Sequence, residues 1–201
     1  MKFSLLRTSA MLMVMALVSA TGFSQSEKQY QELPNFHKVN DRLYRGAQPQ
    51  KGGLKILAAL GIKTILNLRG EDETTQAEQK EAKELGLTYY ALPMGGLSRP
   101  TDKQVEQALA IINNPENGTV FVHCKHGADR TGVVIACYRM LQENHTAEQA
   151  KEEAEKYGMS WVQVGMKRYI GDYHKKLNRE KQTSATTEPA KTISSQVQVA
   201  N

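Results

Sequence analysis

The segment from Val120 to Gly132 holds the residues of this chain whose types and spacing are suited to covalent chemistry. An apolar run ends at Cys124, a short loop containing Gly127 follows, and Arg130 stands six residues after the cysteine. A thiolate is a strong nucleophile, and a planar guanidinium can hold two oxygens of a phosphate group at once. The spacing therefore favours attack by Cys124 on a phosphate ester that Arg130 binds.

The elements on either side of this loop must position those groups. Residues 119–123 are apolar enough for a buried strand, and the pattern of residues 130–141 predicts a helix. Backbone N–H groups at such a turn converge on one point, and the helix dipole adds positive potential there. The same potential stabilises a thiolate, so we expect the pKa of Cys124 to lie below the ordinary value of about 8.5. The predicted phosphate cradle consists of Lys125, His126, Gly127, Ala128, Asp129 and Arg130.

The residues that flank the cradle are expected to support the chemistry. Thr131 can donate its hydroxyl to the cysteine sulfur and help it leave in a second step, whereas His123 is expected to order the loop by hydrogen bonding. Lys125 and His126 add positive charge at the mouth, although a solvated surface lysine is the simpler interpretation of Lys125. A Cys and an Arg six residues apart occur by chance in many proteins, but the full string from His123 to Gly132 is more specific and favours catalysis.

The string from His123 to Gly132 resembles the signature loop of the protein tyrosine and dual-specificity phosphatase superfamily. It is nearest to small exported bacterial members, whose loop has the order His-Cys-Lys-His-Gly followed by Arg-Thr-Gly. Residues 43–49, residues 64–69 and the pair Leu92-Pro93 resemble equivalent segments of that group, so the likeness covers roughly residues 35–177. The resemblance implies a four- or five-stranded sheet flanked by helices, no metal or other cofactor, and a two-step reaction through a phosphocysteine.

The sequence departs from this superfamily at the expected general acid. Members usually supply an aspartate from the loop after Leu92-Pro93 to protonate the leaving oxygen, yet residues 94–99 are Met-Gly-Gly-Leu-Ser-Arg. Asp102 is nearby, but behind Thr101 it is more naturally a first-turn helix residue favoured by the dipole. Asp129 is the other candidate, because an Asp directly before the Arg is similar to phosphoinositide phosphatases of the superfamily. The alternative for Asp129 is that its side chain points away and only shapes the loop.

The missing loop acid bears on the substrate. Phenolic and pyrophosphate leaving groups need less protonation than alkoxides, so aryl phosphates such as phosphotyrosine, or phosphoanhydrides, are favoured over phosphoserine. Lys125, His126 and Asp129 prompt an alternative, a phosphoinositide or inositol polyphosphate phosphatase. A catalytically weak phosphate-binding module is a third interpretation. The expected partner is accordingly a phosphorylated protein or a small phosphorylated ligand.

Strand and helix signals alternate along the middle of the chain. This alternation predicts a single α/β domain over residues 35–180, with a mostly parallel sheet. The expected strands are a hairpin within 36–45, then 62–68, 88–92 and 119–123, and the expected helices are 54–60, 72–85, 101–113, 130–141, 146–157 and 161–177.

The N-terminal residues 1–22 have the features of a signal peptide. Lys2 and Arg7 precede an apolar run over residues 10–18, and small residues lead to a cleavage site expected after Ala20. The run is short for a membrane span, and no second one follows it. We therefore expect an exported protein, periplasmic or secreted, without a stable membrane anchor and with a linker over residues 23–34.

The C-terminal residues 181–201 are rich in Thr, Ser, Gln and Ala and have no sustained apolar face, which predicts a disordered tail. The formal net charge of the chain is +5. Without the predicted leader and tail it falls to about +2, which gives no strong field for a polyanion. No nucleic-acid partner is therefore expected.

The chain has two cysteines, Cys124 and Cys137, and a disulfide is common in exported proteins. The predicted helix places Cys137 roughly 10 Å along its axis from the loop, whereas a disulfide needs Cα atoms within about 7 Å. Cys137 is therefore predicted to be a buried core residue. A redox protein is disfavoured because Cys124 has no second cysteine two residues away, but its thiolate is expected to make activity sensitive to peroxide.

Overall fold

The central strand of the sheet, β5, carries the cysteine of the predicted site at its last position. In the computed structural model, which describes residues 30–187, β5 (Val120–Cys124) lies between β2 and β3 and pairs with both in parallel. All five of its residues are buried, as expected for a strand covered on both faces. Val120 and Val122 face one helical layer and Phe121 faces the other.

The sheet has five strands in the order β1-β2-β5-β3-β4, and only β1 is antiparallel to its neighbour. The predicted α/β fold with a mostly parallel sheet is therefore confirmed, as is the hairpin at residues 36–45. The other strands are β1 (His37–Asn40), β2 (Leu43–Ala47), β3 (Thr64–Asn67) and β4 (Thr88–Ala91).

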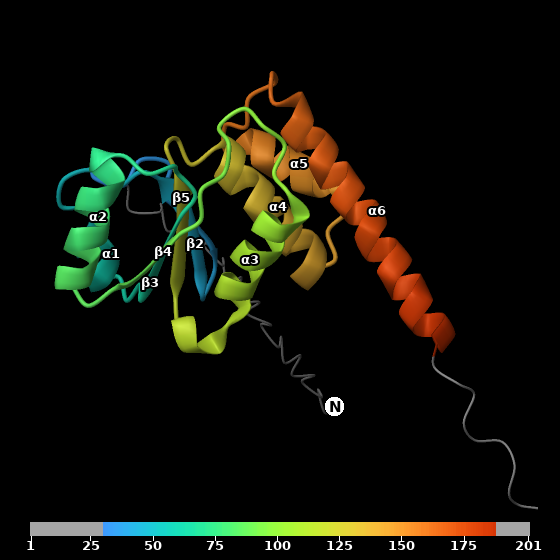
Figure 1. The fold of residues 1–201 in the computed structure, drawn as a ribbon, viewed down its shortest axis with the longest axis horizontal. Coiled ribbons are helices and arrows are strands. Elements are labelled where there is room, and N and C mark those ends of the chain that lie inside the picture. Colours follow the sequence, from blue (N-terminus) through green and yellow to red (C-terminus); the bar gives the residue numbers. More distant parts are fainter. Residues whose placement is uncertain (1–29, 188–201) are drawn as a thin grey trace, which may run out of the picture.

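Helices cover both faces of the sheet (Figure 1). Helices α1 (Gly53–Ala59) and α2 (Glu73–Glu84) pack on the face that carries Ile65 and Phe121. Helices α3 (Asp102–Asn113) and α4 (Asp129–Gln142) pack on the opposite face, and α5 (Ala147–Lys156) and α6 (Val164–Thr187) form a further layer against α4. A short 3-10 turn, η1 (Pro115–Asn117), leads into β5.

The N-cap of α3 is Thr101, the residue that the sequence predicted. Its side chain accepts a hydrogen bond from the amide of Gln104, while the Gln104 side chain accepts from the amide of Thr101. This reciprocal pair of bonds satisfies two amides that the helix itself leaves free. It fixes the end of the 94–101 segment, which borders the site.

Helix α6 differs from the expectation at both ends. It begins at Val164 rather than near Trp161, and it continues through residues 181–187, where a disordered tail was predicted. Tyr169, Ile170 and Tyr173 anchor its first half in the core, and adding turns to an anchored helix costs little. Within this extension the Ser184 hydroxyl donates to the Glu180 carbonyl, four residues earlier in the helix, rather than to a loop contact.

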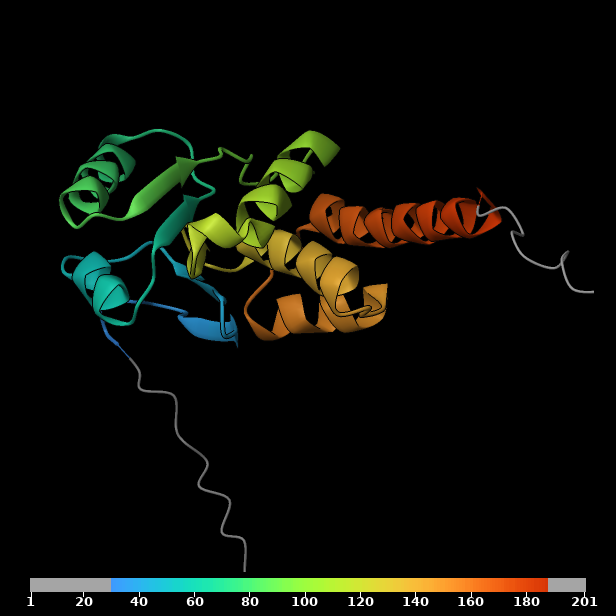
Figure 2. The ribbon, with the colours of Figure 1, turned by 90° about the horizontal axis from the view of Figure 1, so that it is seen from below.

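In two perpendicular views the C-terminal part of α6 extends away from the rest of the fold (Figure 2). Residues 188–201 of the predicted tail, the predicted signal peptide and most of the linker lie outside the described residues. Within residues 30–187, no helix combines the length and the apolar character needed to cross a bilayer.

Both cysteines are free and buried. Cys137 lies in the core between α3, α4 and α6, where burial raises the pKa of its thiol. The prediction of no disulfide, with Cys137 as a core residue, is therefore confirmed.

Candidate active site

Cys124 ends β5, and the loop of residues 125–128 leads directly into α4 at Asp129. In a parallel sheet, the crevice beyond the carboxyl ends of the strands is the usual place for a ligand. The Cys124 side chain is 2% exposed, so its sulfur lies at the bottom of the loop rather than on the surface.

Gly127 makes the turn of this loop. Its φ is +69°, which side chains with a Cβ rarely adopt. A Cβ at Gly127 would also lie 2.4 Å from the carbonyl carbon of Gly46 and 2.6 Å from the amide of Ala47. The loop therefore presses directly against β2, and the turn needs glycine for both reasons.

Three successive carbonyls of the loop accept hydrogen bonds from residues outside the loop, whereas the amide of His126 donates to the Cys124 sulfur. The carbonyl of Lys125 accepts a bond from the amide of Gln48 at 3.4 Å, the carbonyl of His126 accepts from Asn35 Nδ2 at 3.1 Å, and the carbonyl of Gly127 accepts from Arg45 Nη2 at 2.9 Å. We call Asn35, Arg45 and Gln48 the outer wall. Because C=O and N–H point in opposite directions across a planar trans peptide, the next three amides, those of His126, Gly127 and Ala128, face inward.

The environment of Cys124 favours its thiolate. Burial alone would raise the pKa, but hydrogen bonds from the hydroxyl and amide of Thr131, the charge of Arg130 and the amide of His126 together bring the pKa below its ordinary value. Thr131 Oγ1 is buried and is committed to no other hydrogen bond among the described residues, which leaves it free to donate to the sulfur. The shift has the predicted direction.

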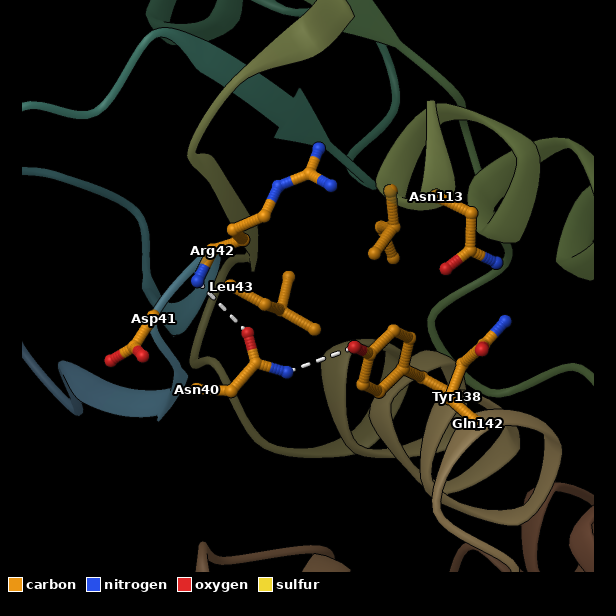
Figure 3. A pocket seen from close by; sticks show the side chains of 8 residues that line it. Asn40, Asp41, Arg42, Leu43, Asn113, Tyr138 and Gln142 are labelled. Atoms are coloured by element: carbon orange, nitrogen blue, oxygen red, sulfur yellow. Dashed lines mark hydrogen bonds between the residues drawn. The ribbon is translucent and has the colours of Figure 1, made fainter. Parts of the chain in front are cut away.

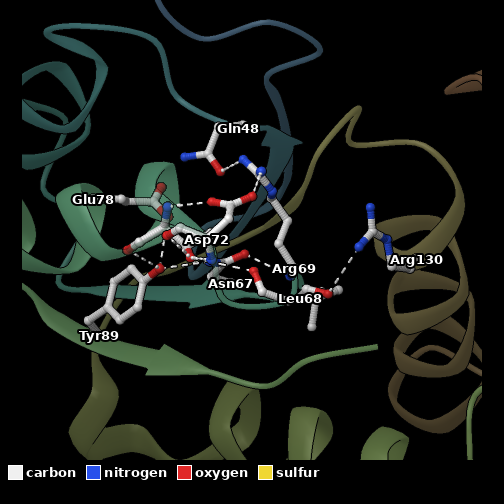
Figure 4. A network of polar contacts seen from close by, with 10 residues as sticks. Gln48, Asn67, Leu68, Arg69, Asp72, Glu78, Tyr89 and Arg130 are labelled. Atoms are coloured by element: carbon white, nitrogen blue, oxygen red, sulfur yellow. Dashed lines mark hydrogen bonds and ion pairs between the residues drawn. The ribbon is translucent and has the colours of Figure 1, made fainter. Parts of the chain in front are cut away.

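Arg130 reaches from the first turn of α4 to the end of β3, where its Nη1 donates to the carbonyl of Leu68 at 3.4 Å (Figure 4). The same figure shows polar contacts that fix this end of the sheet. Asn67 accepts from the amide of Arg69 at 2.8 Å, and Tyr89 donates to Glu78 at 2.9 Å. The guanidinium of Arg69 is engaged by Gln48 and Asp72.

Neither ring nitrogen of His123 makes a hydrogen bond among the described residues, so the prediction that it orders the loop by a hydrogen bond is wrong. Alternate side chains of β5 point to opposite faces, and His123 faces α2 while Cys124 faces α4. His123 Nε2 lies 3.1 Å from Glu78 Oε1, although the angles are not those of a hydrogen bond.

The two candidate acids are both engaged elsewhere. Asp129 Oδ1 accepts a hydrogen bond from the amide of Ser160 at 2.8 Å, which ties the loop to the α5–α6 connection and matches the loop-shaping alternative. Asp102 accepts from the hydroxyl of Tyr169 at 3.0 Å and from Lys176 Nζ at 3.2 Å. The Tyr169 bond, aided by Lys176, holds the pKa of Asp102 below its ordinary value, which disfavours it as a proton donor.

Two further loops lie next to the loop of residues 125–128 and the start of α4: residues 94–100 and 158–163. We call them the mouth loops. Gln163 Nε2 donates to the carbonyl of Gly96 at 3.0 Å and so joins them, and Arg130 lines a small hollow together with Ser98. Each carries a large exposed apolar side chain, since Leu97 is 81% and Trp161 is 82% exposed.

A larger hollow lies at the other end of β5 (Figure 3). Asn40, Arg42 and Tyr138 line it, and Asn40 Nδ2 donates to the Tyr138 hydroxyl at 2.8 Å. It contains no cysteine or other strong nucleophile, so its size does not compete with the chemistry at Cys124. Residues 30–187 also contain no cluster of three or more His, Cys, Asp or Glu side chains suited to a metal ion.

A family model described as a DSP-PTPase phosphatase fused to NAD+ kinase matches residues 12–172 of this chain. The chain belongs to this phosphatase family.

Curated relatives within the cysteine-based phosphatases include dual specificity protein phosphatase TpbA of Pseudomonas aeruginosa, 29% identical over 125 residues, which are 62% of this chain and 55% of the relative. Inositol diphosphatase SIW14 of Saccharomyces cerevisiae is 34% identical over 113 residues, 54% of this chain and 40% of the relative. The chain thus spans about half the length of the curated relatives it matches.

A solved structure supports the same fold. The catalytic domain of the PP-IP phosphatase SIW14 from S. cerevisiae, crystallised with citrate, superposes with a TM-score of 0.64 and 25% identity, covering 78% of this chain and 95% of that one. The family resemblance read from residues 35–177 is therefore confirmed.

Sequence reasoning for this member of the family missed the outer wall. One signal was present: Arg45 lies between Leu43 and Ala47 on the buried face of β2, and a charge at a core position of a strand is unusual. Asn35 gave no such signal, because its positive φ of 52° is visible only in the structure.

Proposed function

We propose that this chain hydrolyses phosphate monoesters through a phosphocysteine at Cys124. One observation carries the proposal: the carbonyls of Lys125, His126 and Gly127 are turned outward, so that successive amides surround a sulfur with a lowered pKa. Such a site both binds an oxyanion and supplies an attacking group.

The reaction proceeds in two balanced steps. The Cys124 thiolate attacks phosphorus, an S–P bond forms, the ester P–O bond breaks, and the leaving oxygen takes a proton from a donor or from water. Water then attacks the phosphocysteine, the S–P bond breaks, inorganic phosphate leaves and the thiolate returns. Arg130 holds two phosphoryl oxygens in both steps, and the Thr131 hydroxyl stabilises the departing sulfur.

The first test is turnover of p-nitrophenyl phosphate by the purified protein and by Cys124→Ser. We expect steady release of phosphate from the wild type and none above background from the variant. Equal rates in the two proteins would exclude a cysteine mechanism. A single burst of product without turnover would instead indicate a phosphate-binding module that has lost its second step.

For the substrate we infer an aryl ester, with phosphotyrosine in a protein as its natural form. Two observations support it. Residues 94–99 carry no acid, and a phenolate leaves without one more readily than an alkoxide does. Leu97 and Trp161 at the mouth offer apolar surface, which suits the side chains around a phosphorylated residue better than a polyanion.

A second candidate is an inositol pyrophosphate or phosphoinositide. It is favoured by the naming of SIW14 as an inositol diphosphatase and by exposed Lys125 and His126 in the loop. Comparison of kcat/KM for a phosphotyrosine peptide and for an inositol pyrophosphate decides between the two. A preference of more than tenfold for the inositol compound would overturn the aryl assignment but leave the phosphocysteine intact.

We also propose that residues 1–22 direct export. The basic start at Lys2 and Arg7 and the apolar run that follows support this. N-terminal sequencing of protein recovered outside the cytoplasm should begin at residue 21 or close to it. Protein that keeps Met1 and stays in the cytoplasmic fraction would contradict the proposal.

A further inference from the structure

Arg45 is a buried charge for which packing gives no reason. It is 1% exposed in the middle of β2, its Nη2 donates to the carbonyl of Gly127 at 2.9 Å, and its guanidinium lies 4.4 Å from the centre of the Tyr157 ring. Its Nε and Nη1 have no hydrogen-bond partner among the described residues. Burial lowers the pKa of Arg45 to about 10, so the group stays charged at neutral pH.

Burying a guanidinium with two unpartnered nitrogens costs free energy, and an apolar side chain of similar size often stabilises a protein more. The neighbours on the same face of β2, Leu43 and Ala47, are apolar. A role in folding stability therefore does not account for Arg45. Its one hydrogen bond points to a role at the loop.

Asn35 makes a similar contact with the preceding carbonyl of the loop, that of His126. Its Nδ2 lies 3.1 Å from the carbonyl of His126 and 3.1 Å from the carbonyl of Tyr157, the C-cap of α5. Its backbone has a φ of 52°, in the left-handed region that asparagine adopts more readily than most other residues. The contact of its amide with the signature loop is the second independent observation at the outer wall.

We propose that Arg45 and Asn35 are positioning residues that hold the carbonyls of Gly127 and His126 outward and thereby aim the following amides at the phosphoryl group. This inference rests on the proposed phosphatase function of Cys124. A donor on a carbonyl fixes the plane of that peptide, and a charged donor also polarises its N–H. Arg45 thus acts on the substrate through the backbone, while Arg130 touches it directly.

The charges around Arg45 are compatible with this role. Glu153 on α5 is the charge that most favours the charged form of Arg45, yet both oxygens of Glu153 are bonded to Arg139 on α4 at 2.9 and 3.1 Å. Tyr157 and Cys124 also favour the charged form of Arg45, and Arg139 opposes it. The guanidinium therefore faces the cysteine loop with its charge only partly balanced.

The experiment compares two variants with matched controls. Asn35→Gly keeps the positive φ and removes the amide, and its control is Asn144→Gly, at the other non-glycine residue with positive φ, 55°, which lies in the loop after α4. Arg45→Met removes the buried charge, and its control is Arg42→Met, whose guanidinium contacts carbonyls of Asn114 and Gly118 at the opposite end of β2.

Three quantities are measured on each folded variant: the dissociation constant of orthovanadate, the pH midpoint of Cys124 alkylation by iodoacetamide, and kcat/KM for p-nitrophenyl phosphate. For Asn35→Gly and Arg45→Met we expect about 10- to 100-fold losses in vanadate affinity and kcat/KM, because small displacements of catalytic groups have effects of this size. The alkylation midpoint should move to higher pH. Both controls should match the wild type.

Arg45→Lys separates the charge from the hydrogen bond. Relative to Arg45→Met, it should return the alkylation midpoint most of the way to the wild-type pH. It should recover only part of the vanadate affinity, because an ammonium lacks the reach and planarity of the guanidinium. Unchanged vanadate affinity and alkylation midpoint in folded Asn35→Gly and Arg45→Met would overturn the inference. A wild-type protein that binds vanadate but never releases product would reject the proposed function alone, since the two binding readouts do not depend on turnover.

Discussion

The outer wall and the mouth loops, which both adjoin the signature loop, are built in contrasting ways. The outer wall consists of directed hydrogen bonds from Asn35, Arg45 and Gln48 to three consecutive carbonyls. The mouth loops present exposed Leu97 and Trp161 and are joined by one side-chain bond from Gln163. In the proposed reaction, the fold itself prepares nucleophilic attack by Cys124, whereas the choice of substrate falls to the mouth loops.

The largest effect is expected at Arg130, which belongs neither to the outer wall nor to the mouth loops. Arg130→Lys keeps the charge but loses the planar pair of donors. We expect kcat/KM for p-nitrophenyl phosphate to fall by about 10²- to 10³-fold, the size seen when one oxyanion donor is removed. Steady-state kinetics check this, and a loss below fivefold would show that the loop amides alone carry phosphate binding.

Gly127→Ala tests the contact between the loop and β2. The new Cβ would meet the backbone of Gly46, and a positive φ is unfavourable for alanine, so we expect destabilisation of about 1–3 kcal/mol and a large loss of vanadate affinity. Denaturant unfolding and vanadate titration measure the two effects. Gly52→Ala is the matched control, because Gly52 also has a positive φ, 88°, but no atom lies within 4 Å of its Cβ position.

Thr131→Val tests the inner side of the loop through its pH dependence. The pKa of Cys124 is lowered, so activity rises as pH increases through that lowered pKa. Removing the hydroxyl should move the acid limb of the kcat/KM profile and the alkylation midpoint to higher pH, toward about 8.5.

The lowered pKa of Cys124 also makes the free energy of unfolding depend on pH. A lowered pKa contributes stability that is present above the unfolded-state pKa and is lost as pH falls through the folded-state value. Thr131→Val should therefore be most destabilising at alkaline pH. Equal destabilisation at pH 5 and pH 9 would contradict a bond from Thr131 to the thiolate.

Asp129→Asn compares a loop-shaping role with proton donation. Asparagine can still accept the Ser160 amide, so a shaping role predicts a change of no more than about threefold for both aryl and alkyl phosphates. A general acid predicts a loss of about 10²-fold or more that is confined to alkyl phosphates. Asp102→Asn serves as the control, because the carboxylate of Asp102 is bonded to Tyr169 and Lys176.

The smallest effect is expected at the mouth. Trp161→Ala removes exposed apolar surface without touching the cradle. We expect KM for a phosphotyrosine peptide to rise by about three- to tenfold, as for a partly buried contact, with kcat for p-nitrophenyl phosphate unchanged. An equal loss for both substrates would mean that Trp161 supports the Ser160 contact rather than the substrate.

The sequence predicted those parts of the fold that local patterns determine. The strand before Cys124, the glycine turn and the helix after it follow one another within 13 residues, and the Thr101 cap is equally local. The outer wall was not predicted because its partners lie 82 and 91 residues from the loop and meet it only through parallel pairing of β2 with β5.

The predictions for residues 181–187 of α6 and for His123 were wrong for related reasons. Tertiary anchoring by Tyr169 and Ile170 extended a helix through residues 181–187, whose composition favours a tail. The alternation of side chains along β5 places His123 next to Glu78 on α2, and no residue near His123 in the sequence indicates that partner. The role of Asp129 depends on Ser160, 31 residues away, so its sequence context alone left two alternatives open.

The separation of the two cysteines determines how this protein would recover from oxidative damage. Cys137 is sealed in the core and faces away from Cys124, so a sulfenic acid formed at Cys124 has no internal thiol with which to condense. Repair then depends on a small-molecule or protein thiol from outside, and prolonged peroxide exposure leads on to irreversible sulfinic acid. Inactivation should accordingly be reversed by dithiothreitol after brief treatment and not after long treatment.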